Sequence, residues 1–477
     1  MLRLDSRSRQ REVLTNWSGF VSGDLMALVA EPAGGADIAA GRLDPAALQT
    51  NFADLHPALT AHEARVEAER CYFCYDAPCQ QACPTSIDIP LFIREIAAKN
   101  PLGAATTILE SNIMGGMCAR VCPTEELCEE ACVREAAEGK PVRIGQLQRF
   151  AVDAQMATGA HPFTRAAPTG RRVAIIGGGP AGLACAHALA VKGHAVTIHE
   201  ARPKIAGLNE YGIAAYKTPD DFAAREAAFI LGVGGIEVKS GAALGRDITL
   251  GELARDYDAV FVGIGLPGVN KLGLPGEEGL ANIVDAVAFI AELRQAKDLT
   301  KLAIGRRVVV IGGGMTAIDV AVQSKLLGAE LVTIAYRRGY EDMKASLYER
   351  DLAQTHGVAI RPWARPISLE GHDGAVSGVV FERTRMVDGK LVGDGAPFRL
   401  EADVVFTAIG QTGATDIFGP TPPTLQGGKI HVDEERRTTL AKVWAGGDCI
   451  AGGLDLTVSA VEDGKRAAAS IDAALRG

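Results

Sequence analysis

The chain has 477 residues, which is enough for roughly three domains at about 150 residues each. A composition of 47% hydrophobic residues and a mean hydropathy of +0.10 allow large buried cores. The net charge of −9 and the lack of a long basic run argue against nucleic acid as the main ligand and against an anionic-membrane anchor.

Two segments bear on the cellular compartment. Residues 1–11 carry basic side chains with no apolar stretch behind them, so we expect no secretory signal. Residues 173–191 are apolar and long enough for a membrane span, but a glycine turn divides them into a strand and a helix. The sequence therefore predicts a cytoplasmic protein that does not bind membranes.

The first 55 residues or so are informative only in outline. Pro32 to Ala36 is predicted to form a loop, and both partner contact and disorder are open for this part of the chain. Readable structure begins at Thr60 and Glu63, which have the spacing of a capping box. They predict a helix that runs through Glu69 and delivers Cys71 at its end.

Ten cysteines form two dense blocks and two isolated positions. The blocks are Cys71-x2-Cys74-x4-Cys79-x3-Cys83-Pro84 and Cys118-x3-Cys122-Pro123-x4-Cys128-x3-Cys132. Helical spacing connects them from Ile87 to Leu109. In a cytosolic chain of this size, such blocks indicate metal or redox chemistry rather than disulfides.

Three interpretations of the blocks are open. Paired thiolates at this spacing suit tetrahedral zinc, whereas the Cys-Pro endings resemble the bacterial ferredoxin run, in which the fourth cysteine reaches a second cluster. The gap between Cys74 and Cys79 is four residues, whereas the ferredoxin run has two, so the spacing matches that run only in its general pattern. Free or disulfide-bonded thiols are the third interpretation. We favour two [4Fe-4S] clusters because a flavin site follows, beside which redox-inert zinc would add only stability.

A strand, a glycine turn and a helix follow from Arg172 onward. Val173 to Ile176 predict a buried parallel strand, Leu183 begins a helix, and Gly177-x-Gly179-x-x-Gly182 lies between them. Such glycines permit a tight turn, let a pyrophosphate approach the backbone and let the helix pack on the strand. The next predicted strand ends at Glu200, the type of acid that binds a ribose 2′-OH. We assign this site to FAD.

The pattern recurs at residues 307–317. Arg307 begins a strand that enters Gly312-x-Gly314-x-x-Ala317, and the following strand ends before Tyr336-Arg337-Arg338 instead of an acid. Guanidinium groups can pair with a 2′-phosphate, so the sequence favours NADPH over NADH. The alternative is that both arginines are merely solvated.

The C-terminal part returns to the first nucleotide fold. Residues 358–400 alternate like strands around two probable hairpin turns, Asp388-Gly and Gly393-Asp-Gly. Residues 402–410 are a strand that enters glycine and leads back to the flavin domain. Asp448 ends a further strand and could hold the ribityl hydroxyls, and Thr457 begins a last helix whose N-terminus is expected near the flavin.

These features predict an α/β fold with an N-terminal α-helical iron–sulfur domain and two Rossmann-like domains, the NAD(P)H domain being inserted in the FAD domain. The expected bounds are 1–165 for the iron–sulfur domain, 166–297 with 409–477 for the FAD domain, and 298–408 for the NAD(P)H domain. Hydride transfer to flavin needs stacking and exclusion of water, so we expect no catalytic acid or base. A disulfide reductase would need a C-x-x-C beside the flavin, whereas Cys185 and Cys449 are isolated and predicted to be packing residues.

With these motifs, the chain resembles the electron-input half of dihydropyrimidine dehydrogenase, most closely the bacterial FAD- and NAD(P)H-binding subunit. The small subunits of glutamate synthase are broader relatives and the runner-up assignment. Segments 76–79, 83–89, 209–213 and 262–270 favour the pyrimidine enzymes. The resemblance implies a partner subunit with FMN in a TIM-type barrel, a heterotetramer, and reduction of uracil or thymine to the 5,6-dihydro form with NADPH or NADH.

The resemblance also implies the cluster ligands. One cluster would be held by Cys71, Cys74, Cys79 and Cys132, and the other by Cys83, Cys122, Cys128 and Gln148, which leaves Cys118 as a non-ligand. The residues expected to contact the two nucleotides are Gly177, Gly179, Pro180, Ala181, Gly182, Glu200, Gly207, Leu208, Lys217, Leu244, Gly312, Gly313, Gly314, Met315, Thr316, Arg337, Arg338, Lys344, Ala408, Ile409, Gly410, Gly447, Asp448, Asp455, Leu456, Thr457 and Val458.

Overall fold

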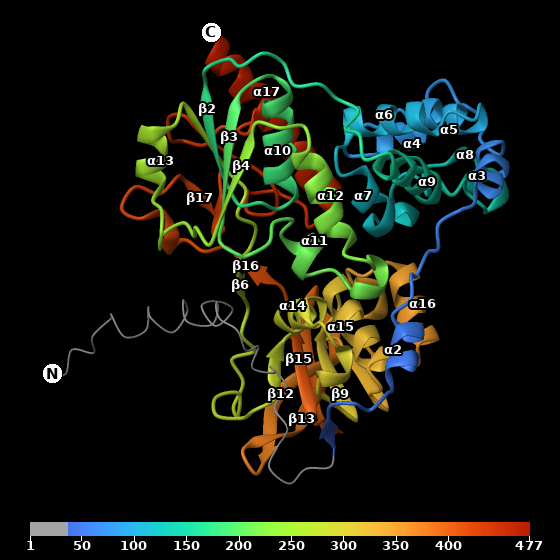
Figure 1. Cartoon of the computed structure of the whole chain (residues 1–477). Coiled ribbons are helices and arrows are strands. Elements are labelled where there is room, and N and C mark those ends of the chain that lie inside the picture. The colour runs from blue at the N-terminus through green and yellow to red at the C-terminus, as the bar shows by residue number, and fades with distance from the viewer. Residues whose placement is uncertain (1–36) are drawn as a thin grey trace.

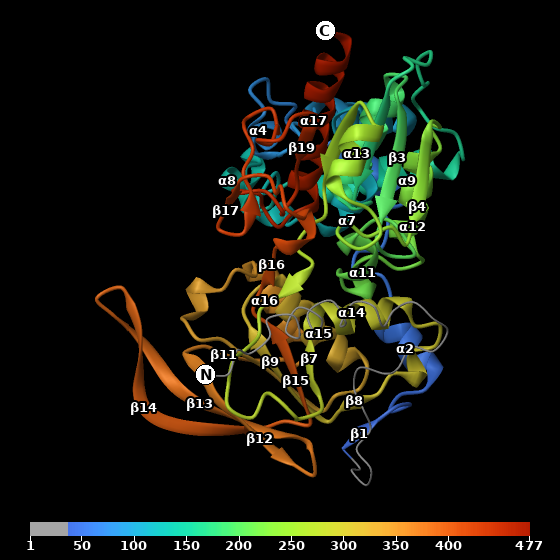
Figure 2. The same cartoon turned by 90° about the vertical axis from the view of Figure 1, so that its left-hand side faces the viewer.

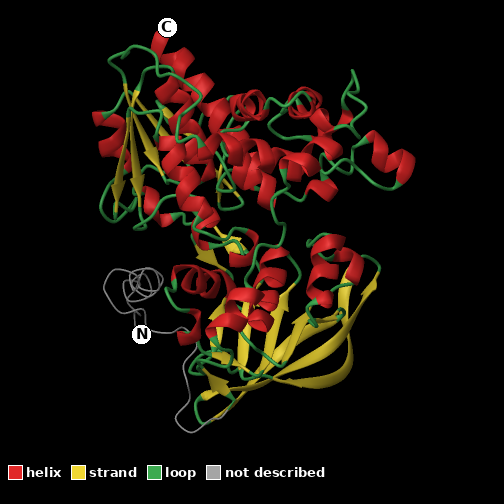
Figure 3. Ribbon diagram, turned by 45° about the vertical axis from the view of Figure 1, so that its right-hand side comes forward, coloured by secondary structure: helices red, strands yellow, loops and turns green. Residues whose placement is uncertain are grey.

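The computed structural model describes residues 37–477 and shows a helical region beside two parallel β-sheets that are flanked by helices (Figures 1 and 3). The loop predicted at residues 32–36 and the expectation for residues 1–11 lie outside the described residues. No helix within residues 37–477 is long and apolar enough to cross a membrane. The α/β fold class predicted from the sequence is confirmed.

The N-terminal region is built from short helices. They are α2 (Pro45–Asn51), α3 (Ala61–Ala68), α4 (Pro78–Ala82), α5 (Ile89–Ala97), α6 (Pro101–Ser111), α7 (Gly115–Val121), α8 (Val133–Glu138) and α9 (Ile144–Ala157). The predicted capping box is present, since Thr60 and Glu63 bond each other's backbone N–H at the start of α3. The helical stretch predicted from Ile87 to Leu109 is divided into α5 and α6, because Lys99 is left-handed with a φ of 63° and Pro101 begins a new helix.

The first sheet has five parallel strands in the order β19-β5-β2-β3-β4. Their bounds are β2 (Arg172–Ile176), β3 (Ala195–Glu200), β4 (Ile236–Ser240), β5 (Ala259–Val262) and β19 (Val443–Ala445). Figure 1 shows α10 (Pro180–Val191), α12 (Phe222–Leu231) and α17 (Thr457–Arg476) on one side of this sheet and α13 (Leu250–Asp256) on the other. Apolar side chains of α5, α6, α7 and α9 join those of α10, α12 and α17 in one core.

The second sheet also has five parallel strands, in the order β11-β10-β9-β15-β7. Their bounds are β7 (Ile283–Asp285), β9 (Arg307–Gly312), β10 (Leu331–Ala335), β11 (Ala359–Arg361) and β15 (Val404–Ala408). Three helices belong to this part of the chain, α14 (Ala286–Gln295), α15 (Met315–Leu326) and α16 (Leu347–Thr355). The domain bounds given by the sequence analysis stay predictions.

An antiparallel sheet of three strands projects from the part of the molecule that contains the second parallel sheet (Figure 2). Its strands are β12 (Ala364–His372), β13 (Ala375–Val387) and β14 (Lys390–Glu401). The hairpin turn predicted at Asp388-Gly389 is confirmed. The turn predicted at Gly393-Asp-Gly is wrong, because these residues lie inside β14, where Gly393 pairs with Thr384.

Short paired segments connect the parts of the molecule. Where the chain passes between the two sheets, β6 (Gly268–Val269) pairs with β16 (Gln411–Thr412). The first described strand, β1 (Ile38–Ala39), pairs with β8 (Ile304–Gly305), and β17 (Leu425–Gln426) pairs with β18 (Lys429–Ile430). The two glycine turns lie at the carboxyl ends of β2 and β9, which is where parallel sheets bind their ligands.

Candidate nucleotide and iron–sulfur sites

The first glycine turn is too crowded for side chains. Gly177 has a φ of 96°, and a Cβ there would lie 2.4 Å from the carbonyl oxygen of Gly263. A Cβ on Gly182 would lie 1.9 Å from the carbonyl oxygen of Gly177. The predicted roles of these two glycines, a tight turn and close packing of helix on strand, therefore match the local geometry. Pro180 and Ala181 open α10 directly after the turn.

Glu200 faces this turn from the end of β3. Its Oε2 accepts the N–H of Gly178 at 2.7 Å and its Oε1 accepts the N–H of Arg202 at 2.8 Å. Burial raises the pKa of the carboxyl, although these backbone donors favour the charged form. Gly207 comes equally close, since a Cβ there would lie 2.9 Å from the Cα of Gly179. The structure thus brings Glu200 and the Gly207–Leu208 segment to the first glycine turn.

Helix α17 completes this edge. Thr457 donates to Asn209 at 2.8 Å, and a Cβ on Gly464 would lie 2.2 Å from the carbonyl oxygen of Ala181. Gly447 precedes Asp448, whose pKa burial raises to about 6, with the charge of Asp455 adding to the shift. The segment from Asp455 to Val458 therefore runs beside the turn. Leu244 packs separately, in the apolar cluster that contains Ile176 and Cys449.

Lys217 lies between the two nucleotide-binding parts. Its Nζ is 2.7 Å from Oδ1 of Asp319 and 2.6 Å from Oε1 of Glu349, and its side chain is 9% exposed. These two carboxylates hold the pKa of Lys217 well above its usual range against the opposing effect of burial. Asp319 and Glu349 come from α15 and α16, so the lysine joins the first nucleotide part to the second.

The second glycine turn repeats the crowding of the first. A Cβ on Gly312 would lie 2.3 Å from the carbonyl oxygen of Ala408, and one on Gly313 would lie 2.5 Å from the ring of Tyr336. Gly314 then caps α15, whose first residues are Met315 and Thr316. The Gly313 carbonyl accepts the N–H of Ala345, which brings the neighbouring Lys344 to the turn.

Arg337 and Arg338 follow β10 and are exposed. Neither guanidinium group forms an ion pair with a described residue, so both are available to an anionic ligand. On the other side of the turn, Asn270 donates to the carbonyl oxygens of Ile409 and Gly410 at 3.2 and 3.1 Å. The nucleotide contacts of all these residues stay predictions.

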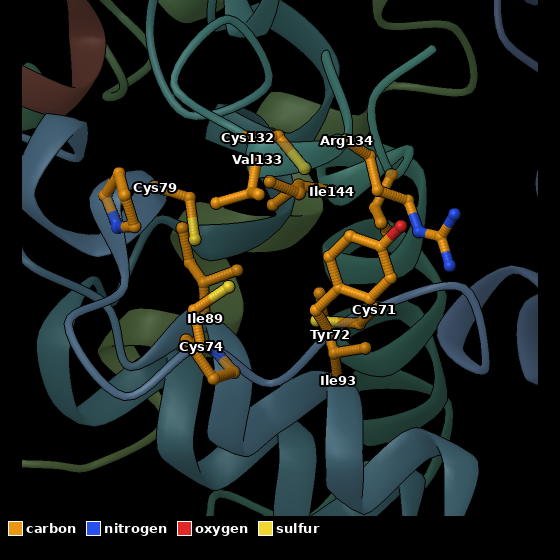
Figure 4. Close-up of a pocket in the computed structure, with 13 residues that line it drawn as sticks. Cys71, Tyr72, Cys74, Cys79, Ile89, Ile93, Cys132, Val133, Arg134 and Ile144 are labelled. Atoms are coloured by element: carbon orange, nitrogen blue, oxygen red, sulfur yellow. The ribbon is translucent and has the colours of Figure 1, made fainter. Parts of the chain in front are cut away.

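The first cysteine cavity is lined by Cys71, Cys74, Cys79 and Cys132. Figure 4 shows the four side chains around a common space, with Tyr72 and Arg134 at one side. The loop that carries three of them is locally strained, because Phe73 and Ala77 have φ values of 52° and 30°. Ile89, Ile93, Val142 and Ile144 supply apolar walls. The structure therefore brings together the four side chains predicted for one cluster.

Two thiols of this cavity, those of Cys71 and Cys79, are unfavourable as isolated anions. Burial raises the pKa of Cys79 to about 12, and Cys132 and Cys71 add to the shift. Burial also raises the pKa of Cys71, whose sulfur accepts the N–H of Phe73 at 3.4 Å. A bound cationic centre would reverse this preference, because metal ligation deprotonates a thiol.

The second cavity is lined by Cys83, Cys118, Cys122, Cys128 and Gln148. Gln148 is 7% exposed and donates through Nε2 to the carbonyl oxygen of Gly115 at 2.6 Å. This bond fixes the amide and leaves Oε1 as the atom available for ligation. Cys118 is buried beside Cys122, and their hydrogen bond, together with burial, raises the pKa of Cys122 well above its usual value.

Val458 is also part of this second cavity. It lies in the first turn of α17, within the segment that runs beside the first glycine turn. The second cavity is therefore the one that adjoins the predicted flavin site. Within residues 37–477, no group of three or more His, Cys, Asp or Glu side chains converges tightly enough to hold a metal ion. The cysteines surround two spaces and do not meet at single points.

Sequence reasoning missed several residues that the fold brings to these sites. Asn112 lines the second cavity, and Thr85 Oγ1 lies 3.4 Å from the sulfur of Cys83. Asp319 and Glu349 hold Lys217. Asn112 lies outside the cysteine spacing, and the partners of Lys217 lie more than a hundred positions away, so no local pattern marks these three residues. The proline–cysteine context of Thr85 is the one signal that could have drawn attention to it.

Two family models match separate parts of the chain, and a solved structure resembles it in fold. Residues 48–160 match the family model described as dihydropyrimidine dehydrogenase domain II, 4Fe-4S cluster. Residues 171–464 match the model of pyridine nucleotide-disulphide oxidoreductases. FprA of Mycobacterium tuberculosis in complex with NADPH has a similar fold, with a TM-score of 0.55 and 19% identity over 64% of this chain and 84% of that one.

The chain is similar to two proteins from Escherichia coli K12 over nearly the whole length of each. The NAD-dependent dihydropyrimidine dehydrogenase subunit PreT is 37% identical over 90% of this chain and 98% of its own. The glutamate synthase [NADPH] small chain is 32% identical over 88% of this chain and 93% of its own.

Fold and site together define an oxidoreductase with an FAD/NAD(P)-binding part and a [4Fe-4S] domain. More particularly, the chain belongs to the family of PreT-like dihydropyrimidine dehydrogenase subunits, within the wider family of glutamate synthase small chains. The resemblance noted from the sequence motifs is confirmed.

Proposed function

We propose that this chain is the electron-input subunit of a dihydropyrimidine dehydrogenase, passing electrons from NAD(P)H to a partner subunit that reduces uracil or thymine. The observation that carries the proposal is the pair of cysteine cavities, one of which shares Val458 with the predicted flavin site. The 37% identity to PreT over nearly the whole chain supports the pyrimidine assignment over other electron acceptors.

The residues present fit the cofactors that this function requires. Both glycine turns have the tight backbone that this motif requires, because no Cβ fits at Gly177, Gly182 or Gly312, and Gly179 and Gly314 leave open space through which a pyrophosphate can approach the backbone. When bound, FAD accepts two electrons and releases them singly, and each [4Fe-4S] cluster carries one. Glu200 would hold the flavin ribose, and Asp448 would hold the ribityl hydroxyls.

The remaining residues would either bind the nicotinamide nucleotide or shield the clusters from water. Arg337 and Arg338 would bind a nucleotide 2′-phosphate, which favours NADPH. The apolar walls of both cysteine cavities would exclude water and so help to set the potential of the clusters. The ligands would be Cys71, Cys74, Cys79 and Cys132 for one cluster, and for the other Cys83, Cys122, Cys128 and Gln148.

The terminal acceptor would belong to another polypeptide. The sheets of residues 37–477 account for two nucleotide sites and include no barrel. A partner that carries FMN in a TIM-type barrel, assembled with this chain as a heterotetramer, would supply the pyrimidine site. This chain would then hold no catalytic acid or base.

The test is reconstitution of the chain with such a barrel partner under anaerobic conditions. Oxidation of NADPH or NADH that depends on uracil and on both subunits is expected, with dihydrouracil as the product. The Cys122→Ala variant should keep NAD(P)H-dependent flavin reduction but lose uracil reduction, because electrons would stop at the flavin. An intact, fully loaded pair that does not reduce uracil or thymine would contradict the proposal.

One alternative function has a specific observation in its favour. The 32% identity to the glutamate synthase small chain suggests delivery of NADPH electrons to a large glutamate synthase subunit. Turnover of glutamine and 2-oxoglutarate to glutamate with such a subunit, and none of uracil with the barrel partner, would select it. A scaffold with structural zinc would instead show zinc, no iron and no colour.

A further inference from the structure

One amide in the wall of the second cavity has an unused donor. Asn112 is 0% exposed and lines this cavity. Its Oδ1 accepts the N–H of Met114 at 3.0 Å, which identifies the other amide atom as Nδ2. Within residues 37–477, Nδ2 has no hydrogen-bond partner. A buried NH2 group without an acceptor is costly, and such groups usually have a partner.

The surrounding backbone holds Asn112 in place. Its own N–H bonds the carbonyl of Ile108 at 2.8 Å at the end of α6. Lys465 of α17 donates to the carbonyl oxygen of the preceding residue, Ser111, at 2.6 Å. The backbone at Asn112 is therefore held on both sides, and one of these anchors comes from the flavin-binding part. The side chain cannot turn toward solvent without breaking its bond to Met114.

We propose that Nδ2 of Asn112 donates a hydrogen bond to the iron–sulfur centre of the second cavity and raises its reduction potential. This inference rests on the proposed function, since it requires a cluster in that cavity. Donors to the sulfur atoms of a cluster stabilise the reduced form, which carries one more negative charge. The step affected is the transfer of one electron to the oxidised cluster, in which no bond to Asn112 is made or broken.

A neighbouring group points to the same centre. Thr85 Oγ1 lies 3.4 Å from the sulfur of Cys83, a predicted ligand, and Thr85 is 2% exposed. Asn112 and Thr85 would thus approach the cluster as neutral donors. They would favour acceptance of an electron by the cluster next to the flavin without bringing a charge into an apolar cavity.

The test is a redox titration of the full-length holoprotein followed by electron paramagnetic resonance. The signal of the second cluster is assigned as the one that Cys122→Ala removes. Asn112→Leu removes the donor at similar volume, and Asn112→Ser keeps a hydroxyl that can accept from the N–H of Met114. At a given solution potential, both variants should shift the oxidised-to-reduced ratio of that cluster about tenfold toward the oxidised form. This corresponds to a reduction potential that is lower by about 59 mV for one electron. The first cluster should not change.

The matched control is Asn100→Leu. Asn100 caps the other end of α6 through a 3.0 Å bond to the N–H of Gly103, is exposed, and does not line the cavity. It should leave both potentials unchanged. If Asn112→Leu loses its cluster, Asn112→Ser decides the question. An unshifted second cluster at full iron content in Asn112→Ser would overturn the inference while the proposed function stood, whereas wild-type protein without acid-labile sulfide would overturn the proposed function itself.

Discussion

Arg337 and Arg338 are the residues that we expect to decide the choice between the two pyridine nucleotides. They follow β10 at the position where the first nucleotide fold has Glu200, and both are exposed. Replacing both with glutamine should raise the KM for NADPH about tenfold or more relative to that for NADH, because charge-assisted bonds to the 2′-phosphate are lost. Steady-state flavin reduction with each nucleotide measures this ratio. Arg255→Gln, an exposed arginine on α13, is the control, and an equal change for both nucleotides would mean that the two arginines are merely solvated.

Gln148 is a proposed ligand of the second cluster, and Cys118 is a neighbouring residue that we expect not to bind iron. Both line the second cavity, so their position alone does not decide which of them binds iron. Gln148→Ala should perturb the spectrum and iron content of one cluster, because the anchored amide is lost, and Cys118→Ala should leave both clusters intact. Iron and sulfide assays with electron paramagnetic resonance measure the difference. Equal iron loss in the two variants would exclude the ligand set that the family resemblance implies.

At the level of elements, α7 and α12 meet at a buried carboxyl. Glu226 of α12 is 0% exposed, and its Oε1 accepts the N–H of Met117 at 2.9 Å. Burial raises its pKa from 4.5 to about 8, against the opposing effects of that hydrogen bond and of Arg120. The neutral form therefore stabilises the fold below pH 4.5, and this contribution is lost as the pH rises through about 8.

This contact predicts a pH dependence of stability. The free energy of unfolding should fall by up to about 1.4 kcal/mol per pH unit within that window because of Glu226. Glu226→Gln keeps the shape and removes the charge, so its denaturant midpoint should vary less with pH than that of the wild type. Glu252→Gln, on the exposed side of α13, is the control. Parallel pH profiles for wild type and Glu226→Gln would contradict the account.

Elements with strong local patterns could be predicted from the sequence. The run before Gly177 is β-branched and apolar and the run after it is helical, and both form as expected because each pattern is satisfied by its own neighbours. Gly393 to Gly395 shows the limit. The same Asp-Gly chemistry that forms a turn at Asp388-Gly389 lies inside β14 at residues 394–395, where the residues between the paired positions Gly393 and Pro397 form an irregularity of the strand and not a hairpin turn.

Contacts between distant segments were beyond prediction. Strand β1 has two residues and pairs with β8 more than 260 positions later, which no periodicity indicates. Gln148 entered the predicted site through family resemblance, whereas Asn112 has no motif and is recognised by burial and an unused donor. The cysteine spacing predicted two groups of thiols, and the family resemblance assigned Cys83 to the second group and Cys132 to the first, where the structure also places them.

In the whole molecule, α16 belongs to the second nucleotide-binding part and contacts both of the other parts of the chain. Ser346, at the start of this helix, donates to Glu125 of the helical region at 2.6 Å, and Tyr348 bonds His56 at 3.1 Å. Glu349 holds Lys217 from the flavin-binding part. The nucleotide-binding parts and the helical region are therefore joined around one helix, which suits a protein that passes electrons from one part to the next.

The most direct test of this electron relay is an anaerobic titration of the full-length protein with NADPH and NADH. We predict one FAD, eight iron atoms and eight acid-labile sulfides per chain, with flavin bleaching followed by paramagnetic signals from two distinct reduced clusters. Flavin that is reduced by the nucleotide in a protein with zinc or without acid-labile sulfide would contradict the account.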